Sequence, residues 1–573
     1  MNHAWNIRCS LPSGANGVLL SDPIETLLSL RGVTSEADRK QFLTPNYDTD
    51  LHDPFLFADM QKLVDRVRKA KEKSEKVGVF GDYDADGITS SVILRRVLER
   101  LGFVVVPYIP DKLTEGHGLH KNALDAFAKE GIRLVFTVDC GMMNHAEIDD
   151  AVSRRMDVIV IDHHHVPEKL PAAFAIVNPK LPDSNYPFTE LCGAGTTFTV
   201  ARALYRTFLP GKEDELKWLL DIAAIGTVAD CMPLIGENRV IVKYGLIVLS
   251  KTRHVGLQEM FAVGNIPIDD DHVPTAQSIA FQIAPRINAA SRMAHAKTAH
   301  ELLMTEKRTE GRLLALELEE QNRSRQKVSE AAAESVRALA ETTYRDRKLI
   351  FAAGEEFPLG VAGLVAGKIA HELGKPTAVF HRGETESTGS FRSIPALNII
   401  EAIGECSELL ERFGGHAQAA GATVLNTNLD AFAEKLEGIV NRKLAETDMT
   451  VRLDIDLEIS SFHITPDFLS RLKKLAPFGM GNPEPTLLIR GVYVNEVRLV
   501  GNGEKHLKVS FQTENGTFGA IGFGMGSLWG DLHTGERVDV VFHLEENRWN
   551  GSSRLEWRLL DICREGEYNA TKM

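Results

Sequence analysis

The chain has 573 residues, of which 43% are hydrophobic and 25% are charged, and it carries a formal net charge of -14. This length corresponds to roughly three to five domains, and the average composition excludes disorder as the main state. No apolar run approaches the roughly 18–20 residues of a membrane helix, and the first residues lack a secretory signal, so we expect a cytoplasmic protein with no membrane partner. The acidic balance argues, at first, against a polyanionic partner.

From about residue 75 the sequence alternates short apolar runs with amphipathic helical stretches. The runs at 76–80, 103–109, 133–138 and 157–161 are rich in β-branched residues, and helical patterns separate them. This alternation predicts βαβ units with a parallel sheet that is covered on both faces. Because ligands of such sheets bind beyond the carboxyl ends of the strands, the segments that follow these strands form the candidate site.

The remainder of the chain predicts three further parts. A largely helical region ends in an uninterrupted stretch from Ala299 to Glu341, which is long enough to connect two lobes. A second αβ segment follows, with strands at 349–353 and 376–380 around a helix. From about residue 451, five or six stretches alternate polar and apolar residues between Gly and Asn turns, which predicts a small antiparallel barrel.

Carboxylates follow the first strand of the predicted sheet. The loop GDYDADG places Asp82, Asp84 and Asp86 at every second position before a glycine that permits a tight turn into a helix. Such carboxylates can converge on hard divalent cations. The pattern also resembles a calcium loop, and a solvated acidic turn is the other alternative. It lacks the twelfth-position Glu of an EF-hand and follows a strand, which argues against the calcium loop.

Later strands bring further ligands to the same edge of the sheet. The third strand ends at Asp139, and the fourth is followed by Asp162, His163 and His164. Asp230 lies at the end of a helical segment, before a proline. Four or five carboxylates with one imidazole and no Cys ligand favour Mn²⁺ or Mg²⁺ over a zinc thiolate site. So many negative ligands favour two ions over one.

The motifs DYDADG, VDCG, DHHH and GTVADCMPL together resemble the four motifs of the DHH phosphoesterase superfamily. The segment 284–293, with the later LEEQNRSRQ, is similar to the connector of the superfamily's single-strand-specific exonucleases, and GGHAQAAG at 414–421 is similar to a glycine-rich motif of the DHHA1 domain. The β-rich end resembles an oligonucleotide-binding (OB) fold. The resemblance covers about residues 50–565 and implies an α/β multidomain protein: a parallel-sheet DHH domain and a smaller αβ DHHA1 domain joined by a long helix, followed by an OB-like β-barrel.

This resemblance divides the chain into five parts. We expect an N-terminal segment at 1–74, a DHH catalytic domain at 75–298, a connector helix at 299–345, a DHHA1 substrate-binding domain at 346–450 and an OB-like single-strand-binding domain at 451–573.

The resemblance also implies the metal ligands, residue by residue. Asp84 and Asp86 are similar to the pair that takes one metal each. Asp139 is similar to the carboxylate that bridges the two metals, and His163 and Asp230 are similar to the ligands that complete the second. The implied cofactors are therefore two divalent cations, Mn²⁺ or Mg²⁺.

Catalytic roles are implied for Asp139, for Asp82 as support of the first ion, and for His164 near the scissile phosphate. The loop Glu115–Gly118 reads EGHG where the superfamily's exonucleases have EGYG, so the role of His117 is open. The implied activity is metal-dependent 5'-to-3' exonucleolytic degradation of single-stranded DNA to 5'-mononucleotides, in DNA recombination and repair. Two alternatives are a DHH phosphodiesterase acting on short oligonucleotides or cyclic dinucleotides, and a catalytically silent single-strand-binding scaffold.

Substrate contacts are expected at two places. Fork donors and an anion nest suit a terminal 5'-phosphate, although each Arg is alternatively an ordinary surface or ion-paired side chain. This set comprises Arg286, Arg292, Ser390, Arg392, Ser393, Gly415 and His416. Basic and aromatic side chains in the barrel suit a single strand. This second set comprises Arg548, Trp549, Arg554 and Arg558.

The net charge of the whole chain argues against a polyanionic partner, but the charge of the predicted barrel weakens this argument. Residues 451–573 contain 14 Lys and Arg against 17 Asp and Glu, a sum of -3, so a DNA groove there must be a local stripe. Single-stranded DNA is the expected partner, and binding should fall steeply with salt. The resemblance further implies a single-strand-binding protein and a RecQ-type helicase as partners, and we expect a monomer.

Overall fold

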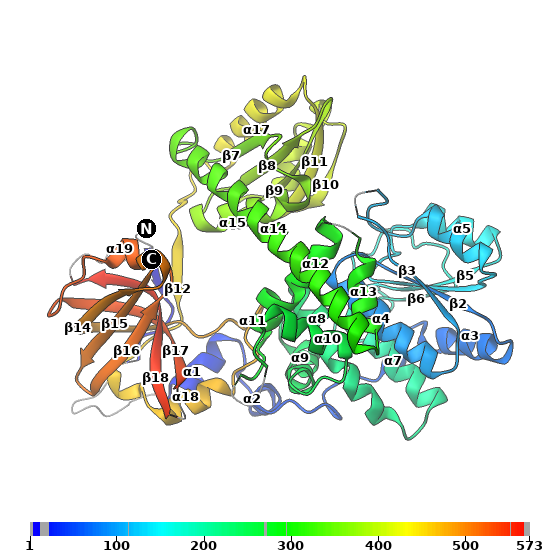
Figure 1. The fold of residues 1–573 in the computed structure, drawn as a ribbon, viewed down its shortest axis with the longest axis horizontal. Helices are drawn as coiled ribbons and strands as arrows, with labels where there is room; N and C mark the ends of the chain where they lie inside the picture. Colours follow the sequence, from blue (N-terminus) through cyan, green and yellow to red (C-terminus); the bar gives the residue numbers. More distant parts are fainter. Residues whose placement is uncertain are drawn as a thin grey trace.

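The structure is a computed structural model that describes residues 4–11, 22–112, 114–268, 272–293, 295–549 and 552–565. A first αβ domain (residues 77–304), a second αβ domain (residues 350–443) and a terminal barrel (residues 487–564) are joined by the long helix α14 (Arg308–Thr342) and by the N-terminal segment (Figure 1). Among the described helices, none has the length and apolarity that a membrane crossing requires.

The first αβ domain is built on the predicted parallel sheet. Its strand order is β3 (Val105–Tyr108), β2 (Val77–Gly81), β4 (Leu134–Val138), β5 (Asp157–Ile161) and β6 (Ala175–Val177), and every pairing is parallel. Strands β2 and β4 are buried along their whole length, which explains why their sequences are continuous apolar runs. The short strand β6 was not predicted.

Helices cover both faces of this sheet, so its loops meet at one edge. One face packs against α3 (Met60–Glu72), α4 (Ala85–Arg100), α7 (Gly193–Phe208) and α8 (Leu220–Ala229). The other face packs against α5 (Lys121–Lys129) and α6 (His145–Ser153). The helical region continues with η3 (Glu213–Leu219), α9 (Gly236–Leu249), α10 (Val255–Gly264), α11 (Ala276–Ser278), η4 (Ile279–Ile283), α12 (Ala284–Met293) and α13 (Lys297–Met304).

The predicted connector is wrong at its start, because the helix from Ala299 is interrupted. Thr305 adopts extended backbone between α13 and α14. Its hydroxyl donates to Glu310 Oε2 at 2.8 Å and accepts from the Lys307 N–H at 3.2 Å, which stabilises the break. Beyond the break α14 buries Leu318 in the core of the first αβ domain and Val336 in the core of the second, so it bridges the two lobes as expected.

The second αβ domain has a mixed sheet in the order β10 (Arg412–His416), β11 (Ala419–Leu425), β9 (Glu386–Arg392), β8 (Thr377–Arg382) and β7 (Ile350–Gly354). Only the β7–β8 pairing is parallel. One face packs against α14 and α15 (Leu359–Leu373), and the other against α16 (Ile399–Gly404), η5 (Ser407–Leu409) and α17 (Leu429–Lys443). Strands β9 to β11 were not predicted, because β9 consists mostly of small and polar residues, and β10 and β11 are rich in Gly and Ala.

The terminal barrel closes through five strands. Their order is β14 (Leu487–Val500), β15 (His506–Thr513), β16 (Gly516–Gly522), β18 (Ser552–Arg564) and β17 (Arg537–Trp549), and β17 pairs back to β14. The β16–β18 pair is parallel, so the barrel is not purely antiparallel. Trp557 is fully buried in its core, where its ring stacks on Phe542 at 4.4 Å between centroids. Smaller elements of this part are β13 (Leu457–Glu458), η6 (Ser461–His463), α18 (Pro466–Lys473), η7 (Asn502–Glu504) and α19 (Gly526–Trp529).

The N-terminal segment is divided between the barrel and the first αβ domain. β1 (Ala4–Ile7) pairs with β12 (Arg452–Ile455), and α1 (Pro23–Leu30) and α2 (Glu36–Leu43) contribute to the barrel core. η2 (Pro54–Leu56) and α3 belong to the first αβ domain. Arg239 of α9 joins the two, because its guanidinium donates to the carbonyls of Phe42 and Ala476, both at 2.7 Å.

Candidate metal centre and substrate site

The loop after β2 is shaped so that its three carboxylates sit at the start of α4. Asp84 caps the helix by accepting from the N–H groups of Asp86 at 2.9 Å and Gly87 at 3.1 Å. A Cβ at Gly87 would lie 2.6 Å from the backbone of Asp82, so only glycine permits this turn. The predicted turn into a helix is confirmed.

Asp86 points inward, to the N-terminus of α7. Its oxygens accept from the N–H groups of Gly193 at 2.6 Å and Ala194 at 2.8 Å, and its side chain is 2% exposed. A Cβ at Gly193 would lie 2.7 Å from Asp139 Cβ, so this glycine lets the helix start approach the carboxylates. The helix N-terminus stabilises the buried negative charge.

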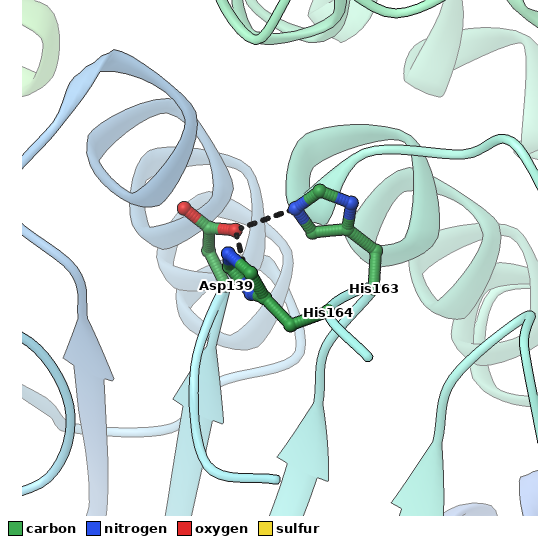
Figure 2. Close-up of side chains that lie close together, drawn as sticks. All are labelled: Asp139, His163 and His164. Carbon is green, nitrogen blue, oxygen red and sulfur yellow. Dashed lines mark ion pairs between the residues drawn. The ribbon is translucent and has the colours of Figure 1, made fainter. Parts of the chain in front are cut away.

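Asp139 follows β4 in a left-handed backbone conformation, with φ +61. Its N–H donates to Ile161 O at 2.9 Å, which ties the end of β4 to β5. Figure 2 shows its carboxylate turned toward two imidazoles: Oδ1 lies 3.2 Å from His163 Nε2 and 3.9 Å from His164 Nδ1. Asp139 is therefore placed at the centre of the ligand set.

His163 connects Asp139 with the carboxylate at the end of α8. Its Nε2 lies 3.5 Å from Asp230 Oδ2 and 3.8 Å from Asp86 Oδ2. Asp230 is the C-cap residue of α8, one residue after the last helical position, and its side chain is 29% exposed. Four elements that are distant in sequence thus bring the predicted ligands together.

The ligand atoms form two adjacent groups. Asp82, Asp84 and Asp139 form one, and Asp86, His163 and Asp230 form the other; within each, the ligand atoms lie within 4.8 Å of one another. Asp139 also groups with His163 and His164 at this spacing. Asp139 therefore lies where one carboxylate can serve both groups.

The electrostatics of this cluster fit divalent cations. Burial, and then the charges of Asp86 and Asp84, raise the pKa of Asp139 well above its usual value. Burial and neighbouring carboxylates likewise raise the pKa of Asp86 to about 6 and that of Asp230 to about 7. Among the described residues, Asp139 Oδ1, Asp230 Oδ2 and both ring nitrogens of His163 are buried without a hydrogen-bond partner. Carboxylates crowded in this way need positive charge, and cations would supply it.

Asp162 holds His164 at the open side of the cluster. Its buried carboxylate accepts from His164 Nδ1 at 2.8 Å and from the Met142 N–H at 3.1 Å. Burial alone would lower the pKa of His164, but the hydrogen bond and charge of Asp162 outweigh it and raise that pKa to about 9. The bond to Asp162 therefore fixes the orientation of this partly exposed imidazole and favours its protonated form. Asp162 was expected among the carboxylates of the metal cluster, but among the described residues it lies in none of the ligand groups and instead orients His164.

His117, whose role the sequence left open, lies at the same edge. Its Nδ1 is 2.8 Å from Asp82 Oδ2, and its ring centroid is 5.5 Å from that of His164. The hydrogen bond to Asp82 raises the pKa of His117. The two glycines that flank it, and the departure of EGHG from EGYG, are the sequence signals of this loop.

Positive side chains from three elements gather beside the carboxylates. Burial, and then the charge of Arg292, lower the pKa of Lys112 to about 8. The charge of Arg392 lowers this pKa further, and the charge of Asp84 opposes the shift. Arg292 donates to Gly360 O at 3.0 Å, and burial with the charges of Arg325 and Arg392 lowers its pKa. Arg392 therefore lies near enough to Arg292 to lower its pKa. Lys112 and Arg325 were missed, because isolated basic residues give no motif.

The other proposed phosphate ligands are more dispersed. Ser390 lies next to Arg392 on β9, and Ser393 Oγ donates to Leu397 O at 2.7 Å. Gly415 and His416 lie on β10, and the GGHAQAAG segment is a β-hairpin rather than the expected anion nest. Arg286 donates to Glu319 Oε2 at 2.7 Å and to two backbone carbonyls, which fits the ion-paired alternative.

The predicted single-strand path is only partly described. Arg554 is exposed on β18. Arg558 on the same strand forms ion pairs with Glu484 and Glu545, so its charge is neutralised within the barrel. Arg548 and Trp549 lie on β17, and their side chains lie outside the described residues.

Comparisons with known proteins agree with this architecture. Three family models match: the DHH family N-terminal domain over residues 76–227, the DHHA1 domain over 346–442 and the RecJ OB domain over 455–561. The chain is 34% identical over 551 residues to the single-stranded-DNA-specific exonuclease RecJ of Bacillus subtilis, a match that covers 94% of this chain and 69% of the relative.

Solved structures give the same result. The crystal structure of RecJ from Thermus thermophilus in complex with Mn²⁺ is 30% identical, with a TM-score of 0.78 and coverage of 98% of this chain and 79% of that chain. The corresponding Mg²⁺ complex has a TM-score of 0.73 at 28% identity, with coverage of 98% of this chain and 78% of that chain. The resemblance to the DHH superfamily and the predicted fold class are confirmed.

Proposed function

Because the chain belongs to the RecJ family of single-stranded-DNA-specific exonucleases, we propose that its metal-centre edge hydrolyses single-stranded DNA from the 5' end and releases 5'-mononucleotides. The chain is a nuclease that uses divalent cations, Mn²⁺ or Mg²⁺. The observation that carries the proposal is the pair of adjacent ligand groups around Asp139, next to Arg292 and Arg392. DNA recombination and repair are the processes that such an activity serves.

The residues of the chain divide the chemical work. When bound, two divalent cations supply activation of water and charge stabilisation of a phosphodiester. Asp84, Asp86, Asp139, His163 and Asp230 would hold them, with Asp82 supporting the first. His164, kept protonated by Asp162, donates a proton or a hydrogen bond to the phosphate. With that chemistry supplied by bound cations, no side-chain nucleophile would be required of the chain.

End selectivity follows from the positive side chains beside the carboxylates. Arg292 and Arg392, with Lys112, would bind a terminal 5'-phosphate by charge-assisted hydrogen bonds. Ser390 lies on β9, Ser393 directly follows that strand, and Gly415 and His416 lie on β10 of the neighbouring hairpin. These four residues would form the outer part of the proposed pocket. A phosphate held there fixes which phosphodiester reaches the cations, so mononucleotides are the expected product.

The terminal barrel would bind the strand that leads to this site. Arg554, Arg548 and Trp549 lie at the paired ends of β17 and β18 and form the proposed contact. We propose that the chain acts as a cytoplasmic monomer on DNA covered by a single-strand-binding protein or unwound by a RecQ-type helicase. Because basic side chains would neutralise the phosphates of the strand, binding of DNA should weaken steeply with salt.

The deciding experiment follows 3'-labelled strands with Mn²⁺ present. A long 5'-phosphorylated single strand should shorten progressively from its 5' end and release 5'-mononucleotides, whereas a blunt duplex should persist. Blocking the 5' end should stop the reaction, and blocking the 3' end should not. Equal turnover of a dinucleotide and a long strand would instead favour a small-substrate phosphodiesterase, and absence of any cleavage would favour a silent scaffold.

A further inference from the structure

The loop that carries His117 is held rigidly on both sides. Gly116 and Gly118 adopt φ +83 and φ +91, a left-handed conformation that favours glycine. Before the loop, Glu115 accepts from Tyr108 Oη at 2.7 Å and from the Asp111 N–H at 2.9 Å. After it, Leu119 exchanges two hydrogen bonds of 3.1 Å with the side chain of Asn144. The loop therefore presents His117 at a fixed position.

At that position His117 contacts only one oxygen of Asp82. Its Nδ1 lies 2.8 Å from Oδ2, whereas Oδ1 of the same carboxylate is buried and, among the described residues, has no hydrogen-bond partner. Asp82 Oδ2 is thus occupied by the imidazole, and Oδ1 is left for the group that Asp82 forms with Asp84 and Asp139. A hydrogen bond to one carboxylate oxygen fixes the orientation of the other.

His117 lies outside the ligand groups themselves. The described groups whose ligand atoms lie within 4.8 Å of one another include Asp82, Asp84 and Asp139 but not His117. The arrangement parallels the neighbouring pair, in which Asp162 holds His164 by a bond of the same length, 2.8 Å. Each imidazole is therefore matched to one carboxylate at the rim of the cluster.

We propose that His117 is a positioning residue for the first cation: it donates Nδ1–H to Asp82 Oδ2 and turns Oδ1 toward that cation. The proposal rests on the proposed function, because it assigns a role within the same metal centre. The His117 side chain is 50% exposed and that of Asp82 is 4% exposed, so solvent screens the pair from one side only, and thermal unfolding without cations measures its contribution to the fold. An effect of His117 on cation binding is therefore separable from an effect on the fold.

The test compares three variants of the full chain. His117→Phe keeps an aromatic ring but removes the donor. His117→Asn places an amide N–H near the position of Nδ1 and so restores the hydrogen-bond donor. His165→Phe removes an exposed imidazole from the same edge and is the matched control.

Calorimetric titration with Mn²⁺ is the first readout. His117→Phe should weaken binding at one of two sites by about 10- to 100-fold, as expected for loss of a partner that orients a ligand. His117→Asn should recover affinity to within a few-fold of the parent, and His165→Phe should match the parent. Nuclease assays should show a raised Mn²⁺ requirement in His117→Phe, with the parental maximal rate at saturating Mn²⁺. Thermal unfolding in chelator should be unchanged.

Two outcomes would overturn the proposal. One is a Mn²⁺ isotherm for His117→Phe that matches the parent, and the other is an affinity loss that His117→Asn does not recover. The parent separates these outcomes from failure of the proposed function, because a parent that binds Mn²⁺ but cleaves no single strand refutes the nuclease assignment whatever His117 does.

Discussion

Asp162 Oδ1 accepts a hydrogen bond from His164 Nδ1 at 2.8 Å, and the same oxygen accepts from the backbone N–H groups of His163 at 2.7 Å and His164 at 3.1 Å. The pKa of Asp162 is lowered to about 2, because the hydrogen bond and charge of His164 outweigh the opposing effect of burial. One carboxylate thus fixes both the backbone and the imidazole at the end of β5.

Replacing this carboxylate should change the pH dependence of cleavage. In the parent His164 stays protonated up to about pH 9, whereas in Asp162→Asn its pKa should return toward the ordinary value of about 6.5. The protonated donor is then lost as pH rises through about 6.5, so the rate should fall roughly 10- to 100-fold at pH 8 and less at pH 6. Rate profiles against pH check this, with the exposed Asp149→Asn as control. Superimposable profiles of parent and Asp162→Asn would contradict it.

Asp139→Asn should abolish cation-dependent cleavage with little change in the fold. Asn tolerates the left-handed φ of +61 at this position, so the variant isolates the lost charge from backbone strain. Asp139 belongs to the group with Asp82 and Asp84 and lies 3.2 Å from His163 of the other group, so losing its carboxylate should lower kcat by about a thousandfold or more. Single-turnover cleavage and Mn²⁺ calorimetry measure the two effects. Asp183→Asn, an exposed carboxylate of the same domain, should behave as the parent. Retention of two tight Mn²⁺ sites in Asp139→Asn would refute the shared position.

Arg392→Ala should reduce the preference for 5'-phosphorylated ends more than it slows the chemical step. Charge-assisted hydrogen bonds contribute about 1.5–3 kcal/mol, so the preference should fall roughly 10- to 100-fold. Competition between 5'-phosphate and 5'-hydroxyl strands measures it. Arg382→Ala removes an exposed charge from β8 of the same sheet and should leave the preference intact. An undiminished preference in Arg392→Ala would remove Arg392 from the phosphate site.

The loop between α18 and β14, which leads into the barrel, contacts the segment that follows Asp230, and a single methyl group should disturb this contact. The Leu234 N–H donates to Met480 O at 2.8 Å, and a Cβ at Gly481 would lie 2.8 Å from Pro233 Cβ. Gly481→Ala should therefore destabilise the chain by about 1–3 kcal/mol beyond the matched variant Gly524→Ala. Gly524 has a similar φ of +74, against +71 at Gly481, but no atom within 4 Å of its Cβ position. Urea unfolding compares the two, and equal stabilities would show that this contact adapts freely.

His300 should make the fold sensitive to acid. It is fully buried in α13, and burial followed by the charges of Arg95 and Arg96 lowers its pKa to about 3. In the unfolded chain this histidine takes up a proton below about pH 6.5, whereas in the folded chain it does so only near pH 3. The free energy of unfolding therefore decreases as the pH drops from about 6.5 toward 3, by up to about 1.4 kcal/mol per pH unit. His300→Leu should flatten this dependence in urea unfolding. The exposed His371→Leu should keep it, and identical slopes for parent and His300→Leu would contradict the prediction.

Much of the metal centre was predictable because its ligands are tied to local signals. Asp84, Asp139 and His163 each follow an apolar strand, and parallel strands place their carboxyl ends at one edge. The strands β9 to β11 were not predictable in this way, because their small residues give little hydrophobic alternation and they are defined by pairing with β8.

Some substrate-site residues were beyond local pattern altogether. Arg286 and Arg292 lie six positions apart on α12 and look equivalent in sequence, yet Arg286 is paired with Glu319 whereas Arg292 lies near Arg325 and Arg392. Lys112 joins those cations from a loop of the first αβ domain. Which arginine is neutralised depends on residues far along the chain, and no window of sequence contains that information.

By itself the sequence determined the parallel sheet, the carboxylates at its edge and the β-rich barrel at the end, because hydrophobic period and strand-end chemistry are local properties. Only the tertiary structure decided that the N-terminal segment is shared between barrel and sheet, that Asp139 stands between two ligand groups, and that His117 contacts Asp82. These are distances between residues on separate elements, and packing of the whole chain sets them.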